Sequence, residues 1–187
     1  MTGPRCTQPP TGAAAEAASM HRASIPTLET ARLRLRAPTL ADLPAWTQIF
    51  ADWPGEPMGG EDAWTEFSYY TGCWILHGHG LWAVELKDGT LAGFVHVGLE
   101  WDDWEPELGW MFLPEHRGQG FATEAASAAR DFARDLLPDV VSYIDPENHP
   151  SQAVAKRLGA TRDAETEAAI LAVDGEAVQV WRHGGAA

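Results

Sequence analysis

The spacing of the hydrophobic residues changes along this chain, and this change restricts the fold more than any other feature of the sequence. Between Thr39 and about His77 the large apolar residues recur at helical intervals, and Thr39 with Asp42 has the spacing of a helix-capping pair. From Leu81 the period becomes that of strands, and Asp88-Gly89 favours a hairpin turn. Helical and strand patterns then alternate to the end of the chain. This order predicts an α/β domain built around one mixed sheet.

About seven strands and four helices are expected. The strands cover residues 32–36, 81–86, 91–99, 107–113 and 140–144, with a last hairpin in 168–182 that turns at Asp174-Gly175; the helices cover 39–50, 61–77, 120–137 and 150–158. A chain of 187 residues suits one well-filled domain. We expect that domain over residues 25–187. Residues 1–24 are rich in Ala, Pro, Gly and Thr and offer no packed apolar face, so we expect them to form a disordered tail.

The net charge of the chain restricts its partners. Thirteen Lys and Arg against 27 Asp and Glu give a formal charge of -14, which repels nucleic acids and anionic membranes and favours a cationic or amine-bearing partner. Cys6 lies in the expected tail and Cys73 in the domain, so a structural disulfide is not expected. The N-terminus has no apolar core of a secretion signal, and the histidines have no metal-binding spacing. We therefore expect a cytoplasmic protein without a bound metal.

The segment Pro114–Glu124 follows a predicted strand and opens a predicted helix. The first N–H groups of a helix lack partners and carry partial positive charge, and Gly118 and Gly120 allow a phosphate to approach the main chain closely. The sequence has neither a nucleoside-triphosphate loop nor a Rossmann fingerprint. The pattern therefore indicates another kind of phosphate-binding turn, with a tight turn that needs Gly only for its conformation as the alternative.

Arg117-x-x-Gly120-x-Ala122 resembles the acetyl-CoA signature R/Q-x-x-G-x-G/A of the GNAT superfamily of N-acetyltransferases. Three further motifs are similar to the RimJ/RimL-like branch of ribosomal-protein N-terminal acetyltransferases: Thr27–Leu33, Glu107–Trp110, and Asn148-x-x-Ser151 leading into Ala155–Ala160. The resemblance covers roughly residues 25–183. It implies a GNAT-like fold and acetyl-CoA as the co-substrate.

The resemblance also assigns residues to acetyl-CoA. Backbone amides of the turn would hold the pyrophosphate, and the main chain before it would pair with the pantetheine arm. The assigned residues are Met111, Phe112, Leu113, Arg117, Gly118, Gln119, Gly120, Phe121, Ala122, Thr123, Asn148 and Ser151. Asn148 would bind the pantetheine amides, with a helix cap before Pro150 as its alternative role.

Acyl transfer to an amine requires a base for the amine and a proton for the leaving thiolate. Glu107, at the start of a strand, is the first candidate for the base, and Glu105 is the second. Ser151 is the candidate acid. Many GNAT enzymes place a Tyr where this sequence has Ala155, so Ser151 or solvent would supply the proton. The reaction implied is direct attack by the amine in a ternary complex.

The acceptor is an amine that the sequence does not identify. The candidates, in order, are a protein N-terminus, a small-molecule amine or amino-acid derivative, and an aminoglycoside-like antibiotic. Tryptophans would line its site or belong to the core: Trp46, Trp53, Trp64, Trp74, Trp101, Trp104 and Trp110. The aromatic surface leaves a homodimer open. A domain that binds CoA without catalysis, as a sensor or interaction module, is the alternative function, and Ala155 favours it.

Overall fold

The computed structural model describes residues 4–51, 59–175 and 177–184. Its strands are β1 (Leu28–Glu29), β2 (Leu33–Arg36), β3 (Leu81–Leu86), β4 (Leu91–Gly98), β5 (Glu107–Phe112), β6 (Val141–Ile144), β7 (Thr161–Arg162) and β8 (Gln179–Arg182). Its helices are α1 (Gly12–Arg22), α2 (Leu43–Ala51), α3 (Gly60–Leu76), α4 (Phe121–Ala133), α5 (His149–Arg157) and α6 (Ala164–Asp174), with 3-10 turns η1 (Arg5–Thr7) and η2 (Pro114–His116).

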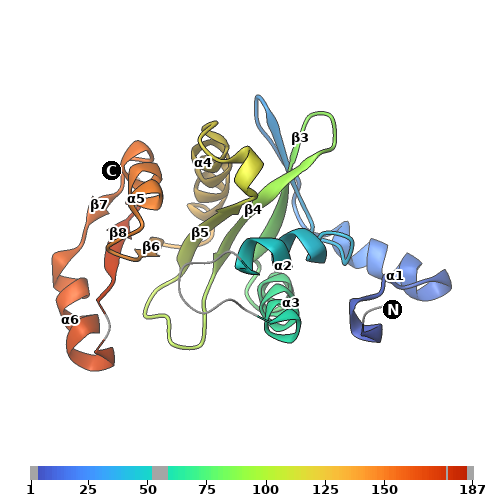
Figure 1. Ribbon diagram of the computed structural model, residues 1–187, viewed down its shortest axis with the longest axis horizontal. Coiled ribbons are helices and arrows are strands. Elements are labelled where there is room, and N and C mark those ends of the chain that lie inside the picture. The colour runs from blue at the N-terminus through green and yellow to red at the C-terminus, as the bar shows by residue number, and fades with distance from the viewer. Residues whose placement is uncertain (1–3, 52–58, 176, 185–187) are drawn as a thin grey trace.

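The eight strands form one sheet in the order β1-β2-β3-β4-β5-β6-β8-β7 (Figure 1). Among these strands, β5 and β6 are the parallel pair and the other neighbours are antiparallel. The β5–β6 pairing is limited to Glu107 opposite Val141, supported by the bond from Val141 N to Pro106 O. Beyond this pair the two strands separate, so the main chain of β5 has an unpaired edge next to β6.

Helices cover both faces of the sheet (Figure 1). On one face α4 buries small residues, among them Ala125, Ala126 and Ala129, and this allows the helix to lie close to the sheet. On the other face α2 and α3 enclose Trp46 and Phe94. In the C-terminal part, α5 packs on the α4 side, and α6 packs Ile170 against β6 and β8 on the opposite side. The predicted class, one mixed α/β sheet, is confirmed.

The capping pair predicted at Thr39 and Asp42 forms, but the helix begins later than expected. The carboxylate of Asp42 accepts hydrogen bonds from Thr39 N at 2.7 Å and Thr39 Oγ1 at 3.0 Å, and Arg36 binds the same carboxylate. Residues 40–42 are a turn, and α2 starts at Leu43. The expected helix from residue 120 to 137 ends at Ala133, a few residues before Pro138, which disfavours helical conformation in the residue preceding it.

The hairpin predicted in residues 168–182 is wrong, because residues 164–174 form helix α6. The side chain of Asp163 accepts from Thr166 N at 3.1 Å and so caps the helix, and Glu165 and Glu167 favour its first turn. Gly175, at φ +77°, ends the helix where a hairpin turn was expected. Strands β7 and β8, which this helix separates in sequence, pair with each other.

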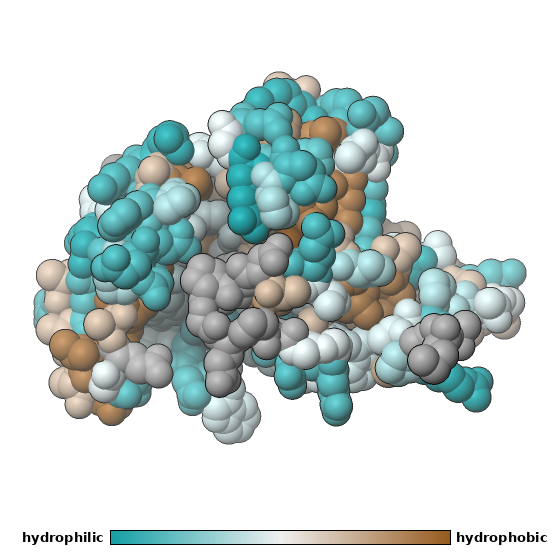
Figure 2. All heavy atoms as spheres, in the orientation of Figure 1, coloured by the Kyte–Doolittle hydropathy of each residue, from teal (hydrophilic) through white to brown (hydrophobic). Residues whose placement is uncertain are grey.

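The N-terminal segment predicted to be a disordered tail contains helix α1, of which no residue is buried. Ile25 is the first residue that joins the core among those described. The division into tail and domain stays a prediction. Figure 2 shows hydrophobic spheres over α6, where Leu171 and Val173 are exposed. None of the helices in the described ranges is long and apolar enough to cross a membrane.

Candidate active site

Strand β5 connects the two parts of the candidate site, the glycine-containing turn that follows the strand and Glu107 at its start. The backbone groups of its successive residues point alternately to the two neighbouring strands. Leu113 N, just after β5, donates to Ala92 O of β4, and Leu108 O accepts from Ser142 Oγ of β6 at 2.5 Å. By this alternation the main-chain groups of Trp110 and Phe112 point to the unpaired edge. The segment expected to pair with pantetheine is Met111 to Leu113. The main-chain groups of Phe112 therefore point to the unpaired edge, and those of Met111 and Leu113 point toward β4.

The turn after β5 presents a row of backbone N–H groups, and we call residues 118–123 the phosphate-binding turn. Gly118 and Gly120 have φ of +74° and +80°, which suits glycine. Within the described ranges, the amides of this turn donate to no protein acceptor. Thr123 Oγ1 is buried and also has no partner there. Unpaired donors at the N-terminus of α4 fit a diphosphate, which supplies acceptor oxygens and negative charge.

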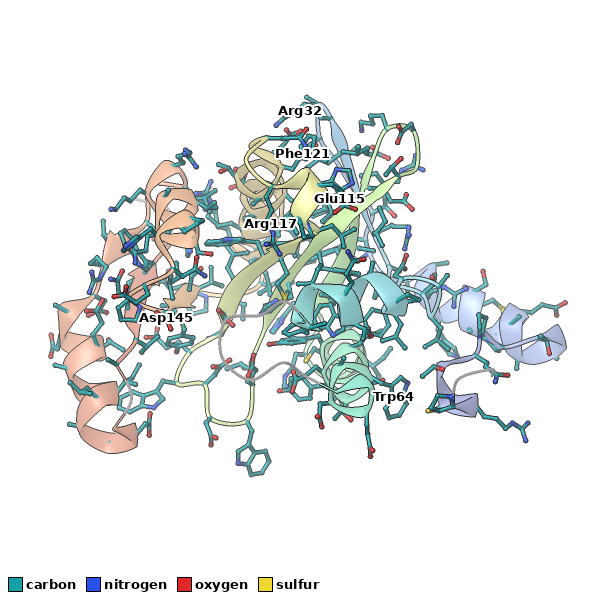
Figure 3. All side chains as sticks on the ribbon, viewed as in Figure 1. Arg32, Trp64, Glu115, Arg117, Phe121 and Asp145 are labelled. Atoms are coloured by element: carbon teal, nitrogen blue, oxygen red, sulfur yellow. The ribbon has the colours of Figure 1, made fainter. Side chains whose placement is uncertain are left out.

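Arg32 lies beside this turn, a position that the sequence did not reveal (Figure 3). Its guanidinium lies 4.6 Å from the ring centre of Phe121, and its Nη1 donates to Gln119 O at 3.0 Å. Glu124 binds both Nε and the backbone N of Arg32, and accepts from Thr30 Oγ1 at 2.6 Å. Burial favours a higher pKa for Glu124, but these hydrogen bonds outweigh it and the pKa falls below its usual value.

Glu107, the predicted base, lies at the other end of β5. Its side chain is 16% exposed, and its Oε2 is 3.3 Å from Nε2 of His96 on β4. The ring of Tyr70, from α3, lies 4.3 Å from the ring of His96 between centroids. The hydroxyl of Tyr70 donates to Glu100 in the loop between β4 and β5. These groups come from α3, β4, the β4–β5 loop and β5.

Four carboxylates gather around this point, and we call them the acidic cluster: Glu66, Glu100, Asp103 and Glu107. Burial, and then the charges of Glu107 and Glu100, raise the pKa of Asp103 to about 6. Burial and the charge of Glu100 also raise the pKa of Glu66. Burial and the charges of Glu107 and Glu100 raise the pKa of Tyr70. The cluster therefore has a negative potential that favours a cationic group.

Glu105, the second candidate for the base, has a different role. Its two carboxylate oxygens accept from Nη1 and Nη2 of Arg182, each at 2.7 Å. Arg182 also binds Asp139 and Asp163. A carboxylate held in this bidentate pair has its oxygens occupied, and it is a poor candidate for a proton acceptor.

Asn148 and Ser151 meet at the start of α5. Asn148 Oδ1 accepts from Ser151 N at 3.1 Å, so the cap that was the alternative role of Asn148 is present. The hydroxyl of Ser151 makes no hydrogen bond with the described part of the chain. Ala155 is fully buried against Ile144 and Trp181. The roles of Asn148 and Ser151 toward acetyl-CoA stay predictions.

The tryptophans divide between core and surface. Trp46 and Trp74 are buried in the core, and Trp101 is 95% exposed. Trp110 packs on both sides of the gap between β5 and the C-terminal strands. Trp53 lies outside the described residues. In the described ranges there is no group of three or more His, Cys, Asp or Glu side chains arranged for a metal ion.

Residues 32–161, more than half of the chain, match the family described as acetyltransferase (GNAT) domain. The chain belongs to the GNAT family of acetyltransferases. The crystal structure of an acetyltransferase from Agrobacterium tumefaciens is similar at 36% identity and a TM-score of 0.77, with coverage of 86% of this chain and 95% of that chain. This places the phosphate-binding turn and β5 within a GNAT domain.

Two further matches cover less of the chain or have lower identity. The uncharacterized N-acetyltransferase YnaD of Bacillus subtilis is 37% identical over 59 residues, which are 30% of this chain and 35% of the relative, so the match spans about a third of its length. The ribosomal alpha-N-protein acetyltransferase RimL, solved in complex with coenzyme A, has 18% identity and a TM-score of 0.61, with 84% and 94% of the two chains covered. At this identity the likeness concerns the fold.

Proposed function

We propose that this protein is an acetyl-CoA-dependent N-acetyltransferase that transfers the acetyl group to a primary amine. The observation that carries the proposal is the arrangement along β5: a carboxylate at its start, an unpaired main-chain edge at its end, and the unpaired N–H groups of the phosphate-binding turn directly after it. In this proposal the acetyl-CoA site and the base that removes the proton thus lie along a single strand.

In this proposal acetyl-CoA lies in the opening between β5 and β6. Its pyrophosphate accepts hydrogen bonds from the phosphate-binding turn, and its pantetheine arm follows the edge at Trp110 and Phe112. Arg117 Nε already donates to Phe112 O at 2.8 Å, which leaves the N–H of Phe112 as the main-chain donor for the arm. Asn148 and Ser151 border the other side of the opening through α5.

Glu107 accepts the proton from the acceptor's ammonium group. The neutral amine nitrogen attacks the thioester carbonyl carbon and the C–S bond breaks. The thiolate takes a proton from Ser151 or solvent, and the proton that the nitrogen loses as the amide forms restores Ser151 or passes to solvent. Neutralising a lysine side chain at pH 7 costs about 4.6 kcal/mol and an α-amine about 1 kcal/mol, from their reference pKa values. A base is therefore useful for either acceptor and decisive for lysine-like amines.

The acidic cluster supports an acceptor that arrives with positive charge, because the potential around Glu107 is negative. A protein N-terminus ranks first, because the motifs resemble the RimJ/RimL-like branch and RimL is an alpha-N-protein acetyltransferase. A small-molecule amine ranks second and an aminoglycoside-like antibiotic third. The cytoplasmic location and the homodimer stay predictions.

The test is calorimetric titration with acetyl-CoA, followed by measurement of thiol release with a panel of peptides and amines. Glu107→Gln is expected to bind acetyl-CoA as the wild type does and to lose about 100-fold or more of kcat, the range of general-base catalysis. Asp102→Asn is the matched control, because it removes the same charge from an exposed neighbouring position. Absence of binding would contradict the proposal, and a fully active Glu107→Gln would refute the role of this base.

The second candidate function is a CoA-binding module without catalysis. The observation that favours it is Ala155, buried where many relatives have the acid Tyr. Binding of acetyl-CoA without thiol release for any acceptor in the panel would support this candidate over the transferase.

A further inference from the structure

The imidazole of His96 occupies space that a side chain on the next strand would fill. His96 of β4 pairs with Gly109 of β5, and a Cβ at position 109 would lie 2.0 Å from Cε1 of His96. Any other residue at this position would displace the ring. The glycine therefore lets the imidazole contact the main chain of β5 closely, two residues from Glu107.

Two further contacts hold the ring in place. Tyr70 covers it at a centroid distance of 4.3 Å, and Tyr70 is itself held by its hydrogen bond to Glu100. His96 is only 4% exposed. With β5 on one side and Tyr70 packed against it, the imidazole has little freedom to rotate, and its Nε2 remains directed at Oε2 of Glu107.

The contacts also assign the tautomer of His96. The carboxylate of Glu107 accepts, so the hydrogen belongs on Nε2. Nδ1 is buried and has no partner among the described residues. In the neutral form it is only an unused acceptor, whereas a hydrogen there would be a buried donor without an acceptor, which is more costly. The neutral Nε2–H tautomer fits both nitrogens.

We propose that His96 is a positioning residue: it holds the carboxylate of Glu107 toward the acceptor amine by donating from Nε2. The inference rests on the proposed function, in which Glu107 is the base. The titratable groups around Glu107 are Glu66 and Tyr70 of α3, His96 of β4, Glu100 and Asp103 of the loop, and Tyr143 of β6. Of these, His96 is the one that contacts Glu107 as a hydrogen-bond donor within the described part of the chain.

The test compares His96→Leu, which removes the donor, with His96→Gln, whose amide can donate from a similar position. We expect His96→Leu to lose about 10- to 100-fold in kcat, with the KM for acetyl-CoA unchanged. A carboxylate that loses a donor has a higher pKa, so the acid limb of the kcat/KM profile should move to higher pH. His96→Gln should recover most of the rate and return the acid limb.

Thermal unfolding and acetyl-CoA titration of each variant establish that it is folded. If His96→Leu does not fold, His96→Gln is compared with His96→Asn, which is polar but too short to reach Glu107, and only the Gln variant should be active. Equal rates for Leu and Gln variants, or an acid limb that does not move, would overturn the positioning role. Failure of the proposed function is distinguishable, because it appears in the wild type as absent transfer or in a fully active Glu107→Gln.

Discussion

The phosphate-binding turn and the acidic cluster lie at the two ends of β5, and they are built in different ways. The turn offers main-chain N–H groups from six consecutive residues, 118–123. The cluster consists of side chains from α3, the β4–β5 loop and β5, and Tyr70, also of α3, donates to one of them, Glu100, across 30 positions of sequence. This difference indicates that cofactor affinity and catalytic rate can be changed separately, the first at the turn and the second at the cluster.

The largest effect on affinity is expected from Gly118→Ala. Gly118 has φ of +74° and open space around its Cα, so an added methyl group strains only the backbone. The strain, about 1–2 kcal/mol, should weaken acetyl-CoA binding by about 5- to 30-fold in calorimetry and leave kcat nearly unchanged. Gly159→Ala is the matched control, because Gly159 has φ of +79°, equally open space and a position after α5. Equal loss of affinity in both variants would mean that the effect is not specific to the phosphate-binding turn.

Thr123→Val tests the side of the turn that faces inward. The buried Oγ1 of Thr123 has no partner among the described residues, so replacing it by a methyl group should leave the free protein as stable or more stable by about 1 kcal/mol. The same change should weaken acetyl-CoA binding by about tenfold if the hydroxyl bonds a phosphate oxygen. Thermal unfolding without acetyl-CoA measures the change in stability, and thermal unfolding with acetyl-CoA measures the change in affinity. Unchanged affinity would limit the binding surface to the main chain.

Arg32→Met examines whether a side chain contributes to the turn. Loss of the charge beside Gln119 and Phe121 should weaken acetyl-CoA binding by about threefold at low salt, and by less at high salt, because exposed charges are screened. Arg34→Met serves as its control, since Arg34 lies two residues further along, in β2, and pairs with Glu29. The Arg34 variant should bind as the wild type does; a similar loss there would show a general charge effect.

The smallest effect is expected at Asp103 in the acidic cluster. Its pKa of about 6 in the folded protein exceeds the ordinary 3.8, so folding disfavours the charged form and stability falls as pH rises through this window. Asp103→Asn should therefore raise the free energy of unfolding at pH 8 and not at pH 4, by about 1 kcal/mol or less after solvent screening. Asp102→Asn, at an exposed position, should show no gain. A destabilised Asp103→Asn at pH 8 would mean that the hydrogen bond from Glu100 N to the Asp103 carboxylate, at 2.6 Å, outweighs the cost of burying its charge.

The same contrast explains how much of the site the sequence predicted. The phosphate-binding turn was found because its residues are contiguous and their glycines are visible as a motif. Glu107 was selected from its place at the start of a strand, and its environment was not predicted. His96 and Arg32 gave no signal, because their positions depend on the pairing of β4 with β5 and on the turn between β1 and β2.

The two Asp-Gly pairs show why the last part of the fold was missed. Gly89 and Gly175 both have positive φ, at +88° and +77°. Asp88-Gly89 forms the expected hairpin turn, whereas Gly175 ends helix α6. A glycine in this conformation suits either role, and the deciding feature lies eleven residues before Asp174, where Asp163 caps the helix. The signal at the turn alone does not distinguish the two structures.

The three carboxylates around Arg182 restrict which substitutions this sequence can accept during evolution. Glu105 precedes β5, Asp139 precedes β6 and Asp163 caps α6, and one guanidinium binds them all. Loss of the arginine alone would leave three like charges facing one another, and loss of one carboxylate alone weakens the tie between β5 and the C-terminal strands. In descendants of this chain the four positions are therefore expected to be kept together or exchanged together, and so to co-vary as one unit.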